Sequence, residues 1–167
     1  MKIPEGVKVE IANGVVKVAG PKGSLSRAYN NRLVSVTIKG NEVEFELLEK
    51  TTRAKNASFH TVQAHVRNMF AGANTDYERK LKVVYAHFPI SLEVKGDKVL
   101  IKNFFGEKTP REAKILPGVK VEIKGQDVIV KGADKDAVGQ TASNLAKASY
   151  KGKRDERVFQ DGIYYDE

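Results

Sequence analysis

The sequence contains no cysteine in its 167 residues. Disulfides, thiolate metal sites and a cysteine nucleophile are therefore excluded, which fits a reducing compartment. No apolar run approaches the roughly 20 residues that a transmembrane helix needs, and residues 1–4 lack the apolar stretch of a signal peptide. We therefore expect a cytoplasmic protein with no membrane partner.

Histidine is scarce, and His60, His65 and His87 are not at the i, i+4 spacing that puts two imidazoles on one metal. The glutamates of residues 42–46 alternate with apolar residues, which predicts a solvent-facing row rather than a partly buried acid or base. We expect no catalytic residue, no metal and no cofactor. A small hydrolase using Ser, His and Asp is the weakest of the hypotheses considered.

The charge is strongly positive, with a formal value of +8 and a pI near 9.5. Such a balance favours a polyanionic partner, because lysine and arginine gain affinity by releasing counterions from phosphates. Residues 1–83 carry 14 basic and 8 acidic side chains, and residues 84–167 carry 15 and 13. The smaller net charge of the second half conceals a dense cationic run close to its end.

The two halves repeat each other. Residues 34–45 align with residues 119–130 at an offset of 85, and residues 9–18 align with residues 92–101 at an offset of 83. A competing alignment pairs Gly6–Ile11 with the identical Gly118–Ile123 at an offset of 112. We prefer the shorter offset, because it is about half the chain and aligns a helical segment after each set of strands.

Each copy predicts two β-hairpins followed by a helix. In the first copy the strands are expected at residues 7–11, 16–18, 34–38 and 43–47, the helix begins at Thr51 or Thr52 and ends at Gly72, and a further strand includes residues 81–84. The helix should cover the sheet with an apolar face made of Phe59, Val62, Val66, Met69 and Phe70. Gly20-Pro21-Lys22-Gly23 lacks the spacing of a phosphate-binding loop, so we interpret it as a hairpin turn.

In the second copy the strands are expected near residues 90–95, 98–104, 118–124 and 127–132, before a helix capped by Asp134. The apolar face of that helix is Val138, Ala142 and Leu145. The sequence thus predicts an α+β protein, made of two tandem copies of a small antiparallel β-sheet packed against one α-helix. The expected lobes are residues 1–82 and residues 83–167, the second with a basic C-terminal extension.

That extension is the most informative segment, since five cations fall within eleven residues, with Tyr150 among them and Phe159 two residues after the last. Phosphate contact and base stacking are both available to such a segment. The alternative is a solvated tail that complements the helix dipole, a role that needs only one or two cations. A second basic stretch surrounds Phe104 and Phe105, which are either core residues or stacking residues.

Several of these motifs resemble those of one family. Val138-Gly-Gln-Thr-Ala142, Tyr150-Lys-Gly-Lys153 and Arg157-Val-Phe-Gln-Asp-Gly-Ile-Tyr164, together with the tandem copies, resemble large-subunit ribosomal protein L six in its archaeal and eukaryotic branch, also called L nine. The resemblance covers essentially the whole chain. One departure is Arg154, which stands where the bacterial branch has glycine.

The resemblance implies a non-enzymatic constituent of the cytoplasmic ribosome. Its second lobe would bind large-subunit ribosomal RNA near the sarcin-ricin region, with translation factors docking nearby and other ribosomal proteins as neighbours. The rRNA-binding residues so implied are Lys147, Tyr150, Lys151, Lys153, Arg154 and Arg157, and secondarily Lys102, Lys108, Arg111 and Lys114. The alternative is a free-standing RNA- or protein-binding module.

Overall fold

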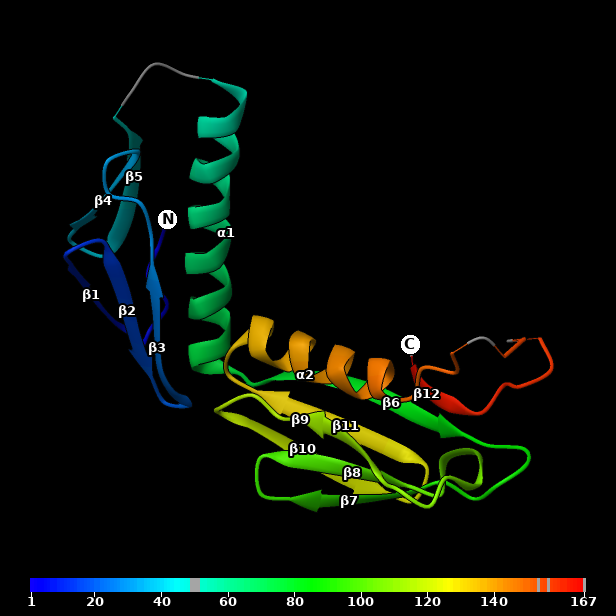
Figure 1. The fold of residues 1–167 in the computed structure, drawn as a ribbon. Helices are drawn as coiled ribbons and strands as arrows, with labels where there is room; N and C mark the ends of the chain where they lie inside the picture. The colour runs from blue at the N-terminus through cyan, green and yellow to red at the C-terminus, as the bar shows by residue number, and fades with distance from the viewer. Residues whose placement is uncertain (49–51, 153, 156, 167) are drawn as a thin grey trace. The chain divides into compact units, whose positions relative to one another are not determined.

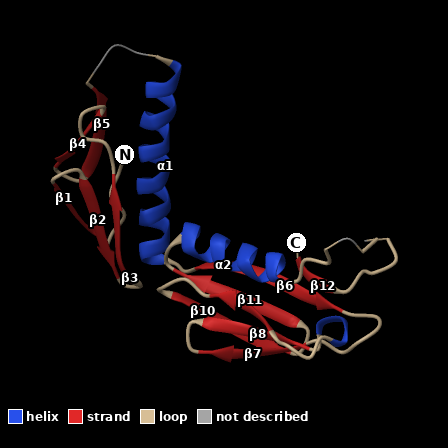
Figure 2. Cartoon of the chain, in the orientation of Figure 1, coloured by secondary structure: helices blue, strands red, loops and turns tan. Residues whose placement is uncertain are grey.

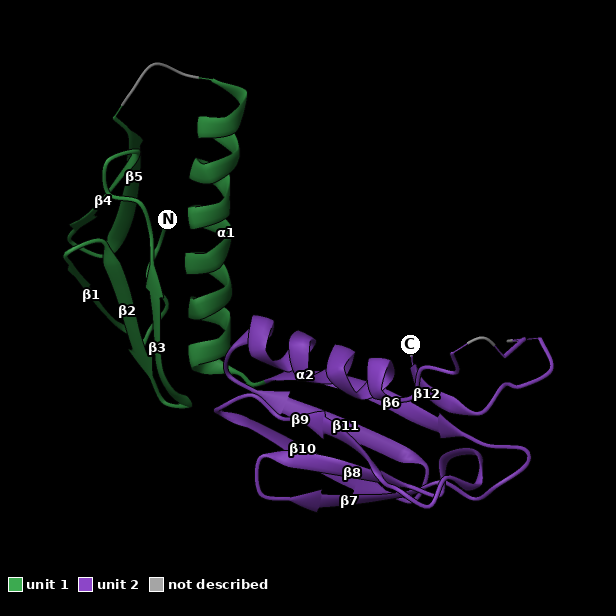
Figure 3. Cartoon of the chain, viewed as in Figure 1, with its two compact units in different colours: residues 1–76 green, residues 77–167 purple. Residues whose placement is uncertain are grey.

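The structure is a computed structural model that describes residues 1–48, 52–152, 154–155 and 157–166. The chain divides into two compact units, Met1–Asp76 and Tyr77–Glu167 (Figures 1 and 3). The expected boundary after residue 82 would cut through a strand, β6 (Tyr77–Val84). This strand pairs along its length with a strand of the second unit, so it belongs there.

The described residues of the first unit form five strands and one long helix, whose arrangement is drawn in Figure 2. The elements are β1 (Lys8–Ala12), β2 (Val15–Gly20), β3 (Gly23–Ala28), β4 (Val34–Lys39), β5 (Glu42–Leu47) and α1 (Arg53–Asn74). The strands form the sheet β1-β2-β3 and the hairpin β4-β5. Asn13 and Gly14 connect β1 to β2 with φ values of 49° and 76°, the left-handed backbone that a tight hairpin turn requires.

Helix α1 covers the strands of the first unit with the expected face. Val66, Met69 and Phe70 are buried, while Phe59 and Val62 pack partly buried against the same core. Thr52 caps the helix, because its Oγ1 accepts a hydrogen bond from Lys55 N at 3.4 Å. Thr51, the other candidate, lies outside the described residues.

The prediction that Gly72 ends this helix is wrong, since α1 continues to Asn74. Gly72 and Ala73 are buried in its last turn, and Ala73 lies against Gly20 of β2. A Cβ on Gly20 would approach the Ala73 Cβ to 2.7 Å, and Lys22 N donates to the Ala73 carbonyl at 3.1 Å. Packing of the helix end on the β2-β3 turn therefore overrides the glycine.

In the second unit, the residues that the structure describes form seven strands, a 3₁₀ turn and a helix. Besides β6, the elements are β7 (Ser91–Lys95), β8 (Lys98–Lys102), the turn η1 (Phe104–Gly106), β9 (Arg111–Lys114), β10 (Val119–Lys124), β11 (Asp127–Gly132), α2 (Lys135–Ala148) and β12 (Gly162–Tyr165). They form the sheets β10-β11-β6-β12 and β7-β8-β9. As expected, Asp134 caps α2 by accepting from Asp136 N at 2.9 Å, and Val138, Ala142 and Leu145 are buried in the core.

The structure confirms the α+β class and the tandem lobes. Hairpin β4-β5 and hairpin β10-β11 begin and end at positions 85 apart, and β1 and β7 begin and end 83 apart. The repeated hexapeptide therefore lies in non-equivalent strands, β1 and β10, and the 112-residue offset is not the structural one. No helix in the described part of the chain is both long and apolar enough to span a membrane.

Candidate nucleic-acid interface

The basic C-terminal segment is folded onto one end of the second unit. Ser149 Oγ accepts a hydrogen bond from Ile163 N at 3.0 Å, which ties the end of α2 to β12. Strand β12 in turn pairs antiparallel with β6, from Gly162 opposite Val84 to Tyr165 opposite Leu81. The end of the extension, Gly162–Tyr165, is thereby part of the four-stranded sheet, and Ile163 is buried in the core.

A buried carboxylate holds the loop after β6 against this segment. Asp161 is fully buried and accepts hydrogen bonds from Ala86 N at 2.9 Å and from His87 N at 3.4 Å, while His87 Nδ1 lies 3.4 Å from its Oδ1. Burial raises the pKa of the Asp161 carboxyl, but the hydrogen bonds from Ala86 and His87 outweigh burial and leave the pKa below its ordinary value. Asp161 is therefore ionised at neutral pH and acts as a structural anchor.

Aromatic rings gather at the same end of the unit. Phe104 is 1% exposed and belongs to the core, and the Phe105 ring meets it edge-on at a centroid distance of 4.6 Å. Phe159 contacts both the Phe105 ring, at 5.8 Å, and the His87 ring, at 5.7 Å. The sequence left open whether this pair belongs to the core or stacks at the surface. Phe104 is a core residue, whereas Phe105 is half-buried at the surface.

The backbone at Phe105 is strained. Its φ is 50°, and Asn103 has a φ of 60°, in the left-handed region that bulky residues avoid. Asn103 Nδ2 donates to the Pro89 carbonyl at 3.0 Å, and the Arg154 guanidinium lies 4.6 Å from the centre of the Phe105 ring. These contacts hold an aromatic ring and a cation together at the surface.

Arg111 anchors the end of α2 rather than presenting its charge to solvent. Its Nε and Nη2 bind the Glu107 carboxylate at 2.8 and 2.6 Å, and its Nη1 donates to the carbonyls of Ala148 and Tyr150 at 3.1 and 2.7 Å. The guanidinium also lies 4.3 Å from the centre of the Phe104 ring. The hydrogen bonds from Arg111 lower the pKa of the Glu107 carboxyl.

Lys151, like Arg111, makes its hydrogen bond within the second unit. It is only 7% exposed, and its Nζ donates to the Tyr164 hydroxyl at 2.5 Å. That hydroxyl donates onward to the Gln160 carbonyl at 2.9 Å. Phosphate contact by Lys151, which its position in the basic run suggested, would first require this buried lysine to leave the hydroxyl of Tyr164, which is itself 40% exposed.

The other predicted residues divide by accessibility. Six of them are exposed: Lys102, Lys108, Lys114, Lys147, Tyr150 and Arg157. Arg154 is exposed as well, in contact with Phe105. Lys102 forms an ion pair with Glu93 that lowers the pKa of the glutamate carboxyl, and Lys153 lies outside the described residues.

The structure adds to the candidate site one residue that was not predicted from the sequence. Tyr165 lines a hollow of about 580 Å³ together with Lys147 and Tyr150, and Ser143 and Ala146 of α2 line it as well. Tyr150 and Tyr165 are 66% and 54% exposed. The only sequence signal was the pair of tyrosines that ends the Gly-Ile-Tyr-Tyr run, and its exposure depends on β12 lying at the edge of the sheet.

A metal site is not found among the described residues, 1–48, 52–152, 154–155 and 157–166. There, no group of three or more His, Cys, Asp or Glu side chains could hold a metal ion. His60 lies on α1 and bonds Gln63, whereas His87 lies in the loop after β6 and faces Asp161.

These features define an α+β protein with duplicated lobes and a cationic, aromatic surface on the second. The family model described as ribosomal protein L6 matches residues 3–74 and 88–162, one stretch in each unit. The chain therefore belongs to the ribosomal protein L6 family, whose members are structural proteins rather than enzymes.

Curated archaeal relatives align with nearly the whole of this chain. The large ribosomal subunit protein uL6 of Ignicoccus hospitalis is 45% identical over 166 residues, covering 97% of this chain and 89% of the relative. The proteins of the same name from Aeropyrum pernix and Methanobrevibacter smithii are 44% and 43% identical, over 98% of this chain and 90% and 92% of theirs.

Proposed function

We propose that this chain is a structural constituent of the large ribosomal subunit that binds large-subunit rRNA mainly through its second unit. Membership of the ribosomal protein L6 family supports the ribosomal role and a location on cytoplasmic ribosomes. The proposed RNA surface lies near the region where translation factors dock. It positions RNA helices through their backbone and shape, more than through base sequence.

The observation that carries the proposal is the pairing of cations with aromatic rings at one end of the second unit. Arg154 stacks on Phe105, and the exposed Arg157 lies two residues before the half-buried Phe159. Phosphates are met by the guanidinium groups, and an unpaired base or a ribose is met by a ring face. We exclude Lys151 and Arg111 from the direct contacts, because their polar atoms are engaged inside the unit.

The ribosomal role is tested by sedimentation. In a lysate separated on a sucrose gradient, the chain should migrate with large subunits and remain there in moderate salt. Recovery only at the top of the gradient would contradict assembly and favour a free-standing module. A protection footprint on large-subunit rRNA, with and without the chain, then locates the RNA that the second unit contacts.

A further inference from the structure

The outer edge of β5, the side that faces away from β4, is only partly paired. Its equivalent in the second unit, β11, is paired on this side along its whole length by β6, from Asp127 opposite Lys82 to Gly132 opposite Tyr77. The internal repeat therefore shows what a completed edge looks like. It also gives the register in which a strand would fill the first one.

Residues 1–3 fill the beginning of the β5 edge in that register. Ile3 N donates to the Asn41 carbonyl at 2.9 Å, as Val83 N donates to the Gln126 carbonyl at 2.8 Å. Asn41 and Gln126 are 85 positions apart, the offset of the repeat. Lys2 lies opposite Glu42 as Lys82 lies opposite Asp127.

The pairing ends at Val43, whose N–H and C=O both bond Met1 at 2.8 Å. In an antiparallel strand alternate residues direct their N–H and C=O groups to the same side, so those of Phe45 and Leu47 also face outward. Among the described residues, neither has a backbone partner on that side. Their counterparts on β11, Val130 and Gly132, lie opposite Arg79 and Tyr77.

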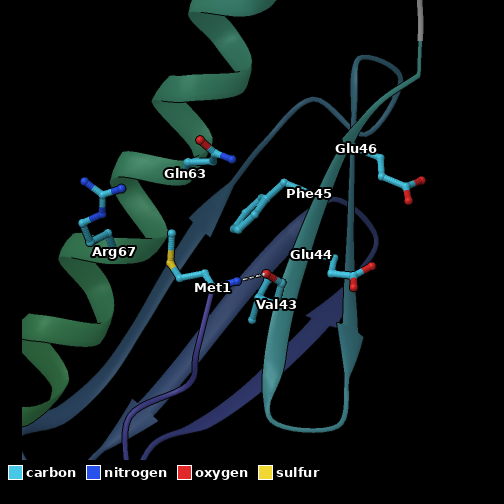
Figure 4. A pocket seen from close by; sticks show the side chains of 7 residues that line it. All are labelled: Met1, Val43, Glu44, Phe45, Glu46, Gln63 and Arg67. Carbon is cyan, nitrogen blue, oxygen red and sulfur yellow. Dashed lines mark hydrogen bonds between the residues drawn. The ribbon is translucent and has the colours of Figure 1, made fainter.

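A hollow of about 340 Å³ lies between this edge and α1 (Figure 4). The side chains of Met1 and Phe45 point toward the helix, whereas those of Glu44 and Glu46 point away from it. Gln63 and Arg67 line the hollow from the helix side. Arg67 is exposed and has no ion-pair partner in the described part of the chain.

We propose that an extended segment of a second protein pairs antiparallel with Phe45 and Leu47, completing the edge as β6 completes β11. The residue opposite Phe45 would share its face and meet Arg67, so a carboxylate is expected there. The residue opposite Glu46 would lie on the other face, where a lysine or arginine is expected. The Glu46 carboxylate disfavours RNA as the occupant, because it would repel phosphates, whereas the charge of Glu44 is already paired with Lys39 at 2.6 Å.

This inference rests on the proposed assembly into large subunits, where the second protein would be a neighbour. Hydrogen exchange should compare the free chain with purified large subunits that contain it. Exchange of the Phe45 and Leu47 amides should slow by about tenfold or more in the subunit, while the inward Glu44 and Glu46 amides are protected in both states. Equal exchange of the outward amides in both states would overturn the proposal.

Site-specific cross-linking identifies the segment that pairs with β5. The chain has no cysteine of its own, so an introduced cysteine is the one place on it where the cross-linker attaches. Glu46→Cys, carrying a short photoreactive cross-linker, should attach to a protein segment within large subunits. Glu42→Cys is the matched control, since it lies on the same strand but opposite Lys2 of the same chain. A product with RNA, or equal protein products from both variants, would overturn the proposal.

The two proposals fail separately. A chain absent from the subunit fraction contradicts the ribosomal role, whereas a chain present there with an open β5 edge contradicts only the docking of a segment. If either cysteine variant fails to assemble, the exchange measurement on the unmodified chain still decides.

Discussion

The two units share their hairpins and helix but differ in how the sheet is completed. In the second unit, β6 and β12 extend the β10-β11 hairpin to four strands, whereas β4 and β5 in the first form a two-stranded sheet, with residues 1–3 bonded along the beginning of the β5 edge. The strand that follows the first helix has joined the second copy. Duplication has therefore produced one four-stranded sheet, in which β11 is paired on both sides, and one two-stranded sheet, in which the β5 edge is paired only at its beginning by described residues.

The units also differ in their buried polar groups. Of the described residues, the buried polar or charged ones are Thr141, Ser149, Lys151 and Asp161, all in the second unit. Three of these lie in the segment after α2. Because buried polar groups are costly unless they are bonded, this segment depends on specific partners, whereas the first unit depends on apolar packing.

The largest expected effect is on the anchor of that segment. Asp161→Ala leaves the N–H groups of Ala86 and His87 without their acceptor and should lower the free energy of unfolding by about 3 kcal/mol. Urea unfolding followed by circular dichroism measures the change. The control is Asp76→Ala in the first unit, whose exposed pair with Lys22 should contribute less than about 1 kcal/mol. Equal losses would remove the contrast between the units.

The next effect concerns affinity for RNA. Replacing both Arg154 and Arg157 with alanine should weaken binding to large-subunit rRNA by about tenfold and lower the slope of log K against log salt by roughly one unit per lost contact. The matched control replaces Lys17 and Arg53, two exposed cations of the first unit. A filter-binding titration at several salt concentrations measures both. If the control pair changes the slope as much, the first unit contributes equally to RNA binding.

A smaller effect follows from the pKa of Asp161. Because its pKa is lower in the folded state than the unfolded value of about 3.9, the charged form stabilises the fold. That contribution is complete above the unfolded pKa and is lost as the pH falls through the folded pKa. Asp161→Asn should therefore lose less stability relative to the unmodified chain in acid than at pH 7. A constant difference across urea titrations at several pH values would contradict this assignment.

Local sequence patterns predicted the strands that alternate apolar and polar residues, together with both helices. They missed β3, β9 and β12, where Gly-Ser-Leu-Ser-Arg-Ala and Arg-Glu-Ala-Lys carry little apolar alternation, and the terminal strand is only four residues long. These strands form because each pairs its backbone with an adjacent strand, β3 with β2, β9 with β8 and β12 with β6. The membership of β6 in the second unit was hidden for the same reason, since its partner β11 follows about 50 residues later.

The sequence predicted where basic residues of the candidate site are concentrated, but not which of them are exposed. Lys151 and Arg111 belong to the basic stretches, yet Tyr164 and Glu107 hold them inside the unit. No sequence pattern distinguishes them from Arg154 and Arg157, because burial depends on contacts made across the fold. Tyr165 was missed for the converse reason, since an apolar run predicts burial and the edge of the sheet leaves its ring exposed.

The smallest expected effect is that of Lys102→Ala, which separates an ion pair from an RNA contact. Lys102 and Glu93 are both about half exposed, so solvent screens their pair and it should contribute little to the free energy of unfolding. If Lys102 serves only this pair, Glu93→Ala and Lys102→Ala should both leave the salt slope of RNA binding unchanged. If Lys102 meets a phosphate, Lys102→Ala alone should make the slope shallower by about one unit, while Glu93→Ala strengthens binding by releasing the cation. The two titrations together decide whether the RNA surface extends from the terminal segment to the end of β8.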